Sequence, residues 1–142
     1  PDFRFSIESV CSVYHYLNAK PERRGDLVRL INEDRLDVGG LYVAPVSDYS
    51  FDEAIYRNLT YGKQWLLEQL GIDTPLAREE DSPGHTLQFP QLCIGFGMRF
   101  ARFSRGPTGV FRWRTIWLIV SVTVPKSCPG AMSRSCSVWW VW

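Results

Sequence analysis

Residues 50–71, SFDEAIYRNLTYGKQWLLEQLG, decide the fold because they carry the clearest helical pattern in the chain. Ser50 and Glu53 match a capping box, in which a hydroxyl and a carboxylate satisfy free backbone amides of the first turn. The apolar residues that follow at helical spacing predict one buried stripe, made of Phe51, Ile55, Leu59, Leu66 and Leu70. Gly71 stands where a left-handed residue commonly ends a helix.

Segments of alternating type lie on either side of this helix. Residues 39–43 (GGLYV) predict a short buried strand before it, and residues 72–79 predict a strand after it. A further helix is expected at about residues 90–94, closed by a glycine, and a further strand at residues 98–103. Strands that alternate with helices in this way favour an α/β fold with parallel strands.

Two more helices are expected near the beginning of the chain. Ser6 predicts the N-cap of a helix whose apolar face holds Ile7, Val10, Val13, Tyr14 and Leu17. Pro21 suits the first position of a second helix. That helix has three apolar residues at helical spacing: Leu27, Leu30 and Ile31.

The composition fits one soluble domain but divides the chain into two parts. The 142 residues are 45% apolar and 22% charged, with a formal charge of +1, which favours neither nucleic acid nor an anionic membrane as a partner. All fifteen acidic residues lie within residues 1–81, and residues 82–142 hold none. We therefore expect residues 114–142 to form an irregular, non-homologous tail, as an out-of-frame segment would; a β-rich segment is the alternative.

Neither the cysteines nor the apolar runs indicate a metal site or a membrane span. Cys11, Cys93, Cys128 and Cys136 form no C-x-x-C pair, so a zinc ribbon is not indicated. The longest apolar run, residues 115–124, is too short for a helix that crosses a bilayer of about 30 Å. No signal peptide is recognisable, and we expect a cytoplasmic rather than a secreted protein.

Chemistry-bearing residues concentrate in one turn, EEDSPGHT (residues 79–86). It follows a predicted strand, and ligands of α/β proteins bind beyond the carboxyl ends of strands. A carboxylate there could act as a nucleophile, a base or a metal ligand, with Gly84 allowing a sharp turn and His85 close in sequence. The alternative is a solvated acidic turn without a catalytic role.

A second function class rests on a run of arginines among aromatic residues. Arg99, Arg102 and Arg105 alternate with Phe100 and Phe103, and the pattern continues to residue 114. Such a surface could bind an anionic partner by phosphate contact and stacking. The chain would then be a non-catalytic α/β binding module.

Several motifs in register resemble one family. Residues 36–45 (LDVGGLYVAP), 61–66 (YGKQWL) and 81–86 (DSPGHT), together with Pro90-Gln91-Leu92 and residues 104–107 (SRGP), are similar to motifs of the glycoside hydrolase family 38 α-mannosidases. The resemblance covers residues 3 to about 113. It implies part of an N-terminal catalytic domain (residues 1–113) built as a partial (β/α)7-type barrel with parallel strands.

The resemblance also implies a mechanism and a set of site residues. Asp81 would be the catalytic nucleophile of a retaining enzyme and a ligand of a divalent metal, which we expect to be zinc. Arg105 and Tyr42 would contact the substrate, a mannose-containing glycan, although a core role is the alternative for Tyr42. His85 is expected to brace the turn by hydrogen bonds.

The motifs that are missing lead to a further expectation. The family's H-x-D metal motif does not occur here, and its acid/base carboxylate would fall where this chain has no acidic residue. A retaining glycosidase needs a second carboxyl group close to the nucleophile. We therefore expect the chain alone to be inactive.

Overall fold

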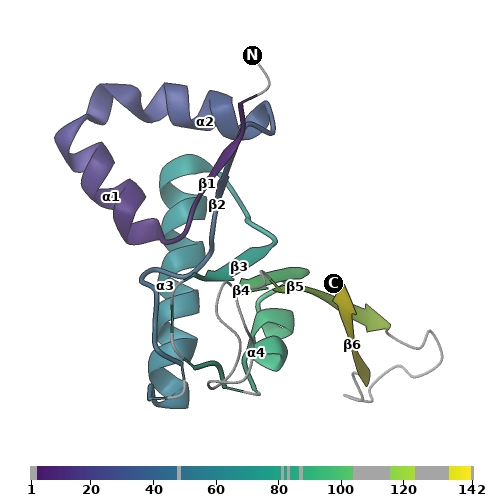
Figure 1. Cartoon of the computed structure of the whole chain (residues 1–142). Coiled ribbons are helices and arrows are strands. Elements are labelled where there is room, and N and C mark those ends of the chain that lie inside the picture. The colour runs from purple at the N-terminus through teal and green to yellow at the C-terminus, as the bar shows by residue number, and fades with distance from the viewer. Residues whose placement is uncertain are drawn as a thin grey trace, which may run out of the picture.

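The strands form two small open sheets in the computed structural model, which describes residues 3–47, 49–80, 82, 84–86, 88–103, 116–123 and 135–141. The first sheet pairs β1 (Phe5–Ile7) with β2 (Leu36–Val38) in parallel. The second begins with β3 (Leu76–Glu79) and β4 (Phe100–Phe103), also parallel. The predicted parallel α/β arrangement is confirmed for these two pairs (Figure 1).

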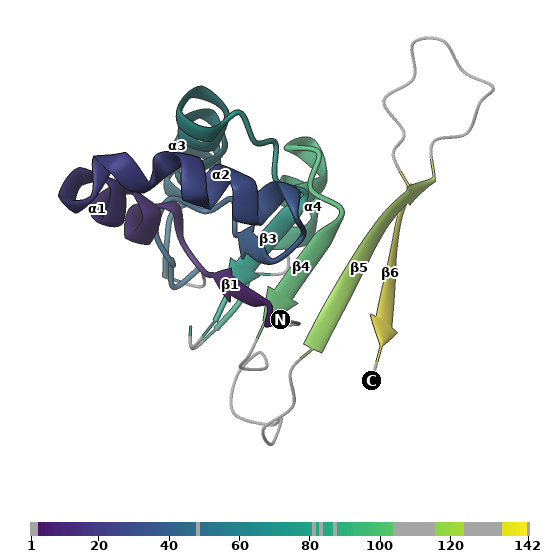
Figure 2. The same cartoon turned by 90° about the horizontal axis from the view of Figure 1, so that it is seen from above.

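The remaining strands correct the prediction of an irregular tail. β5 (Ile116–Thr123) pairs antiparallel with β4, and β6 (Ser135–Val141) pairs antiparallel with β5. They extend the sheet away from the helices at the beginning of the chain (Figure 2). Apolar β-branched residues in these segments favour strands even without a sustained alternation. Because the two sheets are separate and unclosed, a (β/α)7 barrel is not confirmed.

Residues 39–43 do not form the predicted strand, because β2 ends at Val38. Their backbone instead connects the two sheets. The amide of Gly39 donates to the Ile7 carbonyl and that of Gly40 to the Leu76 carbonyl, each at 2.9 Å. The Gly39 amide thus still bonds to the first sheet, and the Gly40 amide bonds to the second, so the backbone passes from one sheet to the other just after β2 ends.

The helices follow the predicted order with shifted starts. They are α1 (Val10–Ala19), a short 3-10 helix (Pro21–Arg23), α2 (Arg24–Asn32), α3 (Asp52–Leu70) and α4 (Phe89–Gly95). Ser6 is not the predicted N-cap, because it lies within β1 and α1 begins after Ser9. None of the helices in the described part of the chain is long and apolar enough to cross a membrane.

The predicted stripe of α3 is confirmed over most of its length and corrected at its first turn. Ile55, Leu59, Leu66 and Leu70 are buried, and Gly71 adopts the left-handed conformation with φ of 70°. Phe51, by contrast, is 87% exposed. The Ser50 hydroxyl donates to the Val46 carbonyl at 3.0 Å instead of capping the helix, so the capping box is wrong.

α3 joins two apolar clusters. Its first half packs with β3, β4 and α4 in a cluster that includes Leu41, Ile55, Leu59, Ala77, Phe89 and Cys93. Its second half packs with α1, α2 and β2 in a cluster that includes Val10, Val13, Leu17, Leu36, Leu66 and Leu70. Between them, Gly62 lets the helix approach the backbone of residues 40–42, where a β-carbon would meet the Gly40 carbonyl oxygen.

Candidate functional site

Glu79 lies at the carboxyl end of β3 and has no exposed surface. Its position follows from the alternation of a strand, in which residues two apart face the same side. Ala77, two residues earlier, belongs to the cluster formed with α3 and α4. Glu79 therefore projects toward the helices, into the protein.

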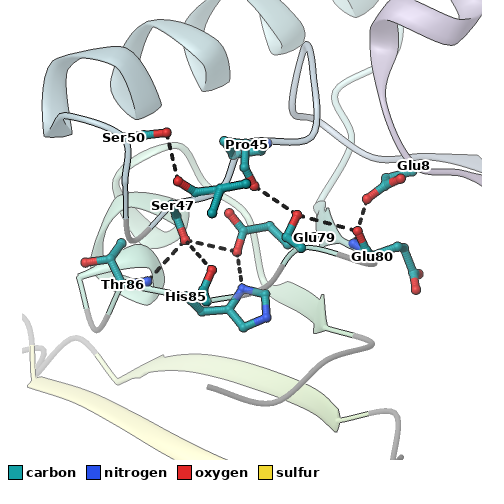
Figure 3. Close-up of polar contacts among 11 residues, drawn as sticks. Glu8, Pro45, Ser47, Ser50, Glu79, Glu80, His85 and Thr86 are labelled. Atoms are coloured by element: carbon teal, nitrogen blue, oxygen red, sulfur yellow. Dashed lines mark hydrogen bonds and ion pairs between the residues drawn. The ribbon is translucent and has the colours of Figure 1, made fainter. Parts of the chain in front are cut away.

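A small polar network, here called the bracing network, surrounds this carboxylate and consists of Ser47, Glu79, His85 and Thr86 (Figure 3). One oxygen of Glu79, Oε2, accepts a hydrogen bond from the Ser47 hydroxyl at 3.3 Å and lies 2.5 Å from Nδ1 of His85. The Ser47 hydroxyl in turn accepts from the Thr86 amide at 3.1 Å. If Glu79 is ionised, Nδ1 must carry the proton, because an ionised carboxylate only accepts.

The network connects two loops that follow different strands. Ser47 belongs to the segment between β2 and α3, and His85 and Thr86 belong to the segment after β3. A further contact crosses between the same segments, from the Ser82 hydroxyl to the Pro45 carbonyl at 2.9 Å. These bonds hold the described residues of the predicted site turn against the preceding loop.

The other side of the strand ends carries a second group, here called the charge cluster: Glu8, Arg78, Glu80 and Arg102. Arg78 forms an ion pair with Oε1 of Glu80, and Arg102 reaches the same oxygen at 2.8 Å. The Glu80 amide donates to Oε1 of Glu8 at 2.6 Å (Figure 3). Arg78 and Arg102 stand opposite each other in the parallel register of β3 and β4.

The structure places only part of the predicted site. Asp81 and Arg105 lie outside the described residues, so their predicted roles in catalysis, metal binding and substrate binding stay predictions. Tyr42 is half-buried and packs against the cluster of α1, α2 and β2. With Tyr61, Gln64, Trp65 and Glu68 it lines a hollow of about 400 Å³ on the side of α3. None of the contacts described for Tyr42 reaches the bracing network.

Within the described part of the chain, the residues do not assemble a zinc site. No group of three or more histidine, cysteine, aspartate or glutamate side chains in those ranges is arranged to hold a metal ion. Nδ1 of His85 is committed to Glu79, and His15 lies on the exposed face of α1 beside Tyr14. The structure therefore agrees with the prediction that His85 braces the turn.

Sequence reasoning missed Ser47 and the two-sided arrangement of the strand end. Ser47 carries no motif signal, since a serine in a loop is common. Strand alternation, however, could have predicted that Glu79 and Glu80 face opposite sides of the sheet. Glu79 shares its side with Ala77, and Glu80 shares the other side with Arg78.

Comparison with known proteins assigns the family. Residues 1–117 match the N-terminal domain of the family 38 glycosyl hydrolases, and the chain therefore belongs to this family. The match extends slightly past residue 113, and the predicted domain boundary there stays a prediction.

Two individual proteins show how much of the family's architecture the chain represents. A protein of Halalkalibacterium halodurans named "Putative mannosylglycerate hydrolase" is 34% identical over 102 residues, which are 66% of this chain and 11% of that protein. An α-mannosidase from Enterococcus faecalis superposes with a TM-score of 0.64 at 23% identity, over 75% of this chain and 12% of that one. The chain thus spans about a tenth of the length of either protein.

Proposed function

We propose that this chain supplies a segment of the catalytic domain of a glycoside hydrolase that cleaves α-mannosides. The observation that carries the proposal is the family match over residues 1–117. The names of the two similar proteins, a mannosylglycerate hydrolase and an α-mannosidase, support a mannose-containing substrate. The position of the polar groups beyond the carboxyl ends of parallel strands is also typical of such catalytic domains.

Within this function, the chain's own residues would hold the site rather than complete it. The bracing network fixes His85 and Thr86, and the bond to the Pro45 carbonyl fixes Ser82. These three residues lie on the carboxyl-terminal side of Asp81 in sequence. Glu80, on the amino-terminal side, is held by two arginines. We propose that Asp81, between these anchors, is the nucleophile of a retaining reaction. The second carboxyl group that this reaction requires would come from outside the chain.

The alternative, a module that binds an anionic partner through its arginine and aromatic run, has less support. Arg102 belongs to that run, yet its guanidinium is paired with Glu80 at 2.8 Å. Arg99 does stack over the Phe100 ring, with 5.6 Å to its centroid. Most of the remaining run lies outside the described residues.

A chimera tests the proposed function. Residues 1–117 would replace the matching segment of the Halalkalibacterium halodurans protein, and hydrolysis of a chromogenic α-mannoside would be measured with and without added zinc. We expect turnover by the chimera, none by the 142-residue chain alone, and loss of turnover in the chimera with Asp81→Asn. A chimera that folds like its parent yet shows no hydrolysis would contradict the proposal, provided that the parent is active in the same assay.

A further inference from the structure

Asn58, in α3, makes three hydrogen bonds to the loop that follows β2. Its side-chain oxygen Oδ1 accepts from the Val43 amide at 2.9 Å, and its side-chain nitrogen Nδ2 donates to the Val43 carbonyl at 2.8 Å. Its backbone carbonyl also accepts from the Tyr42 amide at 3.2 Å. Because a carboxamide offers an acceptor and a donor side by side, Asn58 pairs with Val43 as a residue of a neighbouring antiparallel strand would.

Residues 43–47, which begin at this pairing, contain the groups that anchor the predicted site turn. The Pro45 carbonyl accepts from the Ser82 hydroxyl at 2.9 Å. The Ser47 hydroxyl accepts from the Thr86 amide at 3.1 Å (Figure 3). The helix therefore holds this segment, and the segment holds the turn.

The residues between the pairing and Ser47 have little conformational freedom. The ring of Pro45 fixes its own φ angle, and a residue that precedes a proline, here Ala44, is restricted to extended conformations. Ser47 is only 2% exposed, so it is also enclosed on its remaining sides. A shift at the start of this short, stiff segment should therefore reach the Ser47 hydroxyl.

We infer that Asn58 is a positioning residue for the turn that carries Asp81, and that it acts through Ser47. This inference rests on the proposed function, in which Asp81 is the nucleophile, and adds a residue from outside the turn. A small displacement of a nucleophile slows the chemical step strongly, even when its cause lies far from the reacting atoms. Loss of the Asn58 pairing should therefore lower kcat and leave KM nearly unchanged.

The first measurement uses the isotope-labelled 142-residue chain and follows the Thr86 amide proton. Asn58→Leu removes both side-chain bonds to the loop at similar size. We expect the Thr86 amide to exchange with solvent faster, relative to the amides of α1, and its chemical shift to move in the same direction as in Ser47→Ala, which removes the acceptor itself. The matched control is Gln64→Leu, which removes an exposed amide whose bond to Glu68 stays within α3. It should leave the Thr86 amide unchanged.

The second measurement is a double-mutant cycle on kcat in the chimera that carries residues 1–117. Asn58→Leu and Ser47→Ala should each lower kcat roughly tenfold or more, with KM changed less than about threefold. If Asn58 acts through Ser47, the double variant should be about as slow as the slower single variant, because the second change finds the connection already broken. Effects that multiply would show that the two residues act separately and would overturn the inference.

The remaining outcomes separate this inference from the proposed function. An unchanged Thr86 amide or an unchanged kcat in Asn58→Leu would overturn the inference even if the chimera hydrolyses mannosides. A chimera without hydrolysis would overturn the catalytic role of Asn58 together with the proposed function, and the amide measurement would still decide whether Asn58 positions the turn. If Asn58→Leu fails to fold, Asn58→Asp keeps the acceptor for the Val43 amide but not the donor. A smaller change at Thr86 in the same direction would then support the inference, and no change would overturn it.

Discussion

Glu79 and Glu80 are consecutive residues at the end of β3, yet the structure gives them opposite environments. The side chain of Glu79 is completely buried on the helix side, with a hydroxyl and an imidazole as partners. The side chain of Glu80 keeps 20% of its exposure on the other side and pairs with two arginines. Neighbouring positions in a strand face opposite sides, so one of these two carboxylates is enclosed by the fold and the other is reached by solvent.

Burial changes how much a charged group contributes to the stability of the fold. A buried carboxylate that loses its partners, or leaves partners without it, costs several kcal/mol, whereas pairs that solvent reaches contribute about 1 kcal/mol or less. The helix side should therefore contribute more to stability than the helix-free side. Each of the following experiments tests one part of that division.

The largest effect is expected from Glu79→Ala. The substitution leaves the buried Ser47 hydroxyl and the His85 imidazole without their shared acceptor, so the free energy of unfolding should fall by roughly 3 kcal/mol. Urea unfolding followed by circular dichroism measures it. Glu79→Gln is the matched control, because it keeps an acceptor oxygen and should cost clearly less. A Glu79→Ala chain as stable as the original would show that the bracing network does not support the fold.

The next effect comes from Gly62→Ala, which tests how closely α3 must approach the strand ends. The added β-carbon would meet the Gly40 carbonyl oxygen and the Tyr42 amide. Moving the helix away should cost about 1–3 kcal/mol.

Gly25→Ala in α2 is the control for this change, since a β-carbon there meets nothing within 4 Å. It should raise stability by up to about 1 kcal/mol through helix propensity alone. If Gly62→Ala and Gly25→Ala change the thermal unfolding temperature alike, the stability of the fold does not depend on the close approach at Gly62.

Much of the helix-side architecture was predictable from local sequence. The stripe of Ile55, Leu59, Leu66 and Leu70 and the end at Gly71 follow from helical periodicity, which local residues determine. The start of the helix was not predictable in the same way. Ser50 has the composition of a cap, but the chain around it turns so that its hydroxyl contacts the Val46 carbonyl. Phe51 then points into solvent instead of extending the stripe.

The position of the candidate site in the sequence was predictable, but the residues that contact one another there were not. The acidic turn at residues 79–86 was found because it follows a strand. Its partners come from far away in sequence: Ser47 is 32 residues before Glu79, and Glu8 is 72 residues before Glu80. Such pairs depend on how the strands assemble, and no local pattern records them. The same holds for the pairing of β5 with β4 and of β6 with β5, which the composition of the segment did not reveal.

A smaller effect on the free energy of unfolding is expected from the Cys93 thiol, on the helix side, at alkaline pH. Burial, and then the nearby Glu79 carboxylate, raise the pKa of its thiol far above the ordinary range. The folded chain therefore keeps this proton at a pH where the unfolded chain, with a thiol pKa of about 8.5, releases it. Stability contributed by the protonated thiol is present below that pH and declines as the pH rises above it.

We expect the free energy of unfolding to fall between about pH 8.5 and 10, by at most roughly 1.4 kcal/mol per pH unit from this group. Cys93→Ala should lower stability at neutral pH but flatten the slope. Denaturant unfolding at several pH values measures both. A slope that Cys93→Ala leaves unchanged would assign the pH dependence to other groups.

The smallest stability effect is expected from Arg102→Met. A small effect is expected because Arg102 lies on the side of the sheet that solvent reaches. Glu80 would still pair with Arg78, and the methionine keeps the apolar part of the side chain against the sheet. The free energy of unfolding should change by less than about 1 kcal/mol, as for other solvent-accessible pairs. Measured under the same urea conditions, Arg102→Met should lose clearly less stability than Glu79→Ala. If Arg102→Met instead destabilises the chain as much as Glu79→Ala, the charge cluster is part of the folding core, and the two sides of β3 do not differ in the way the structure indicates.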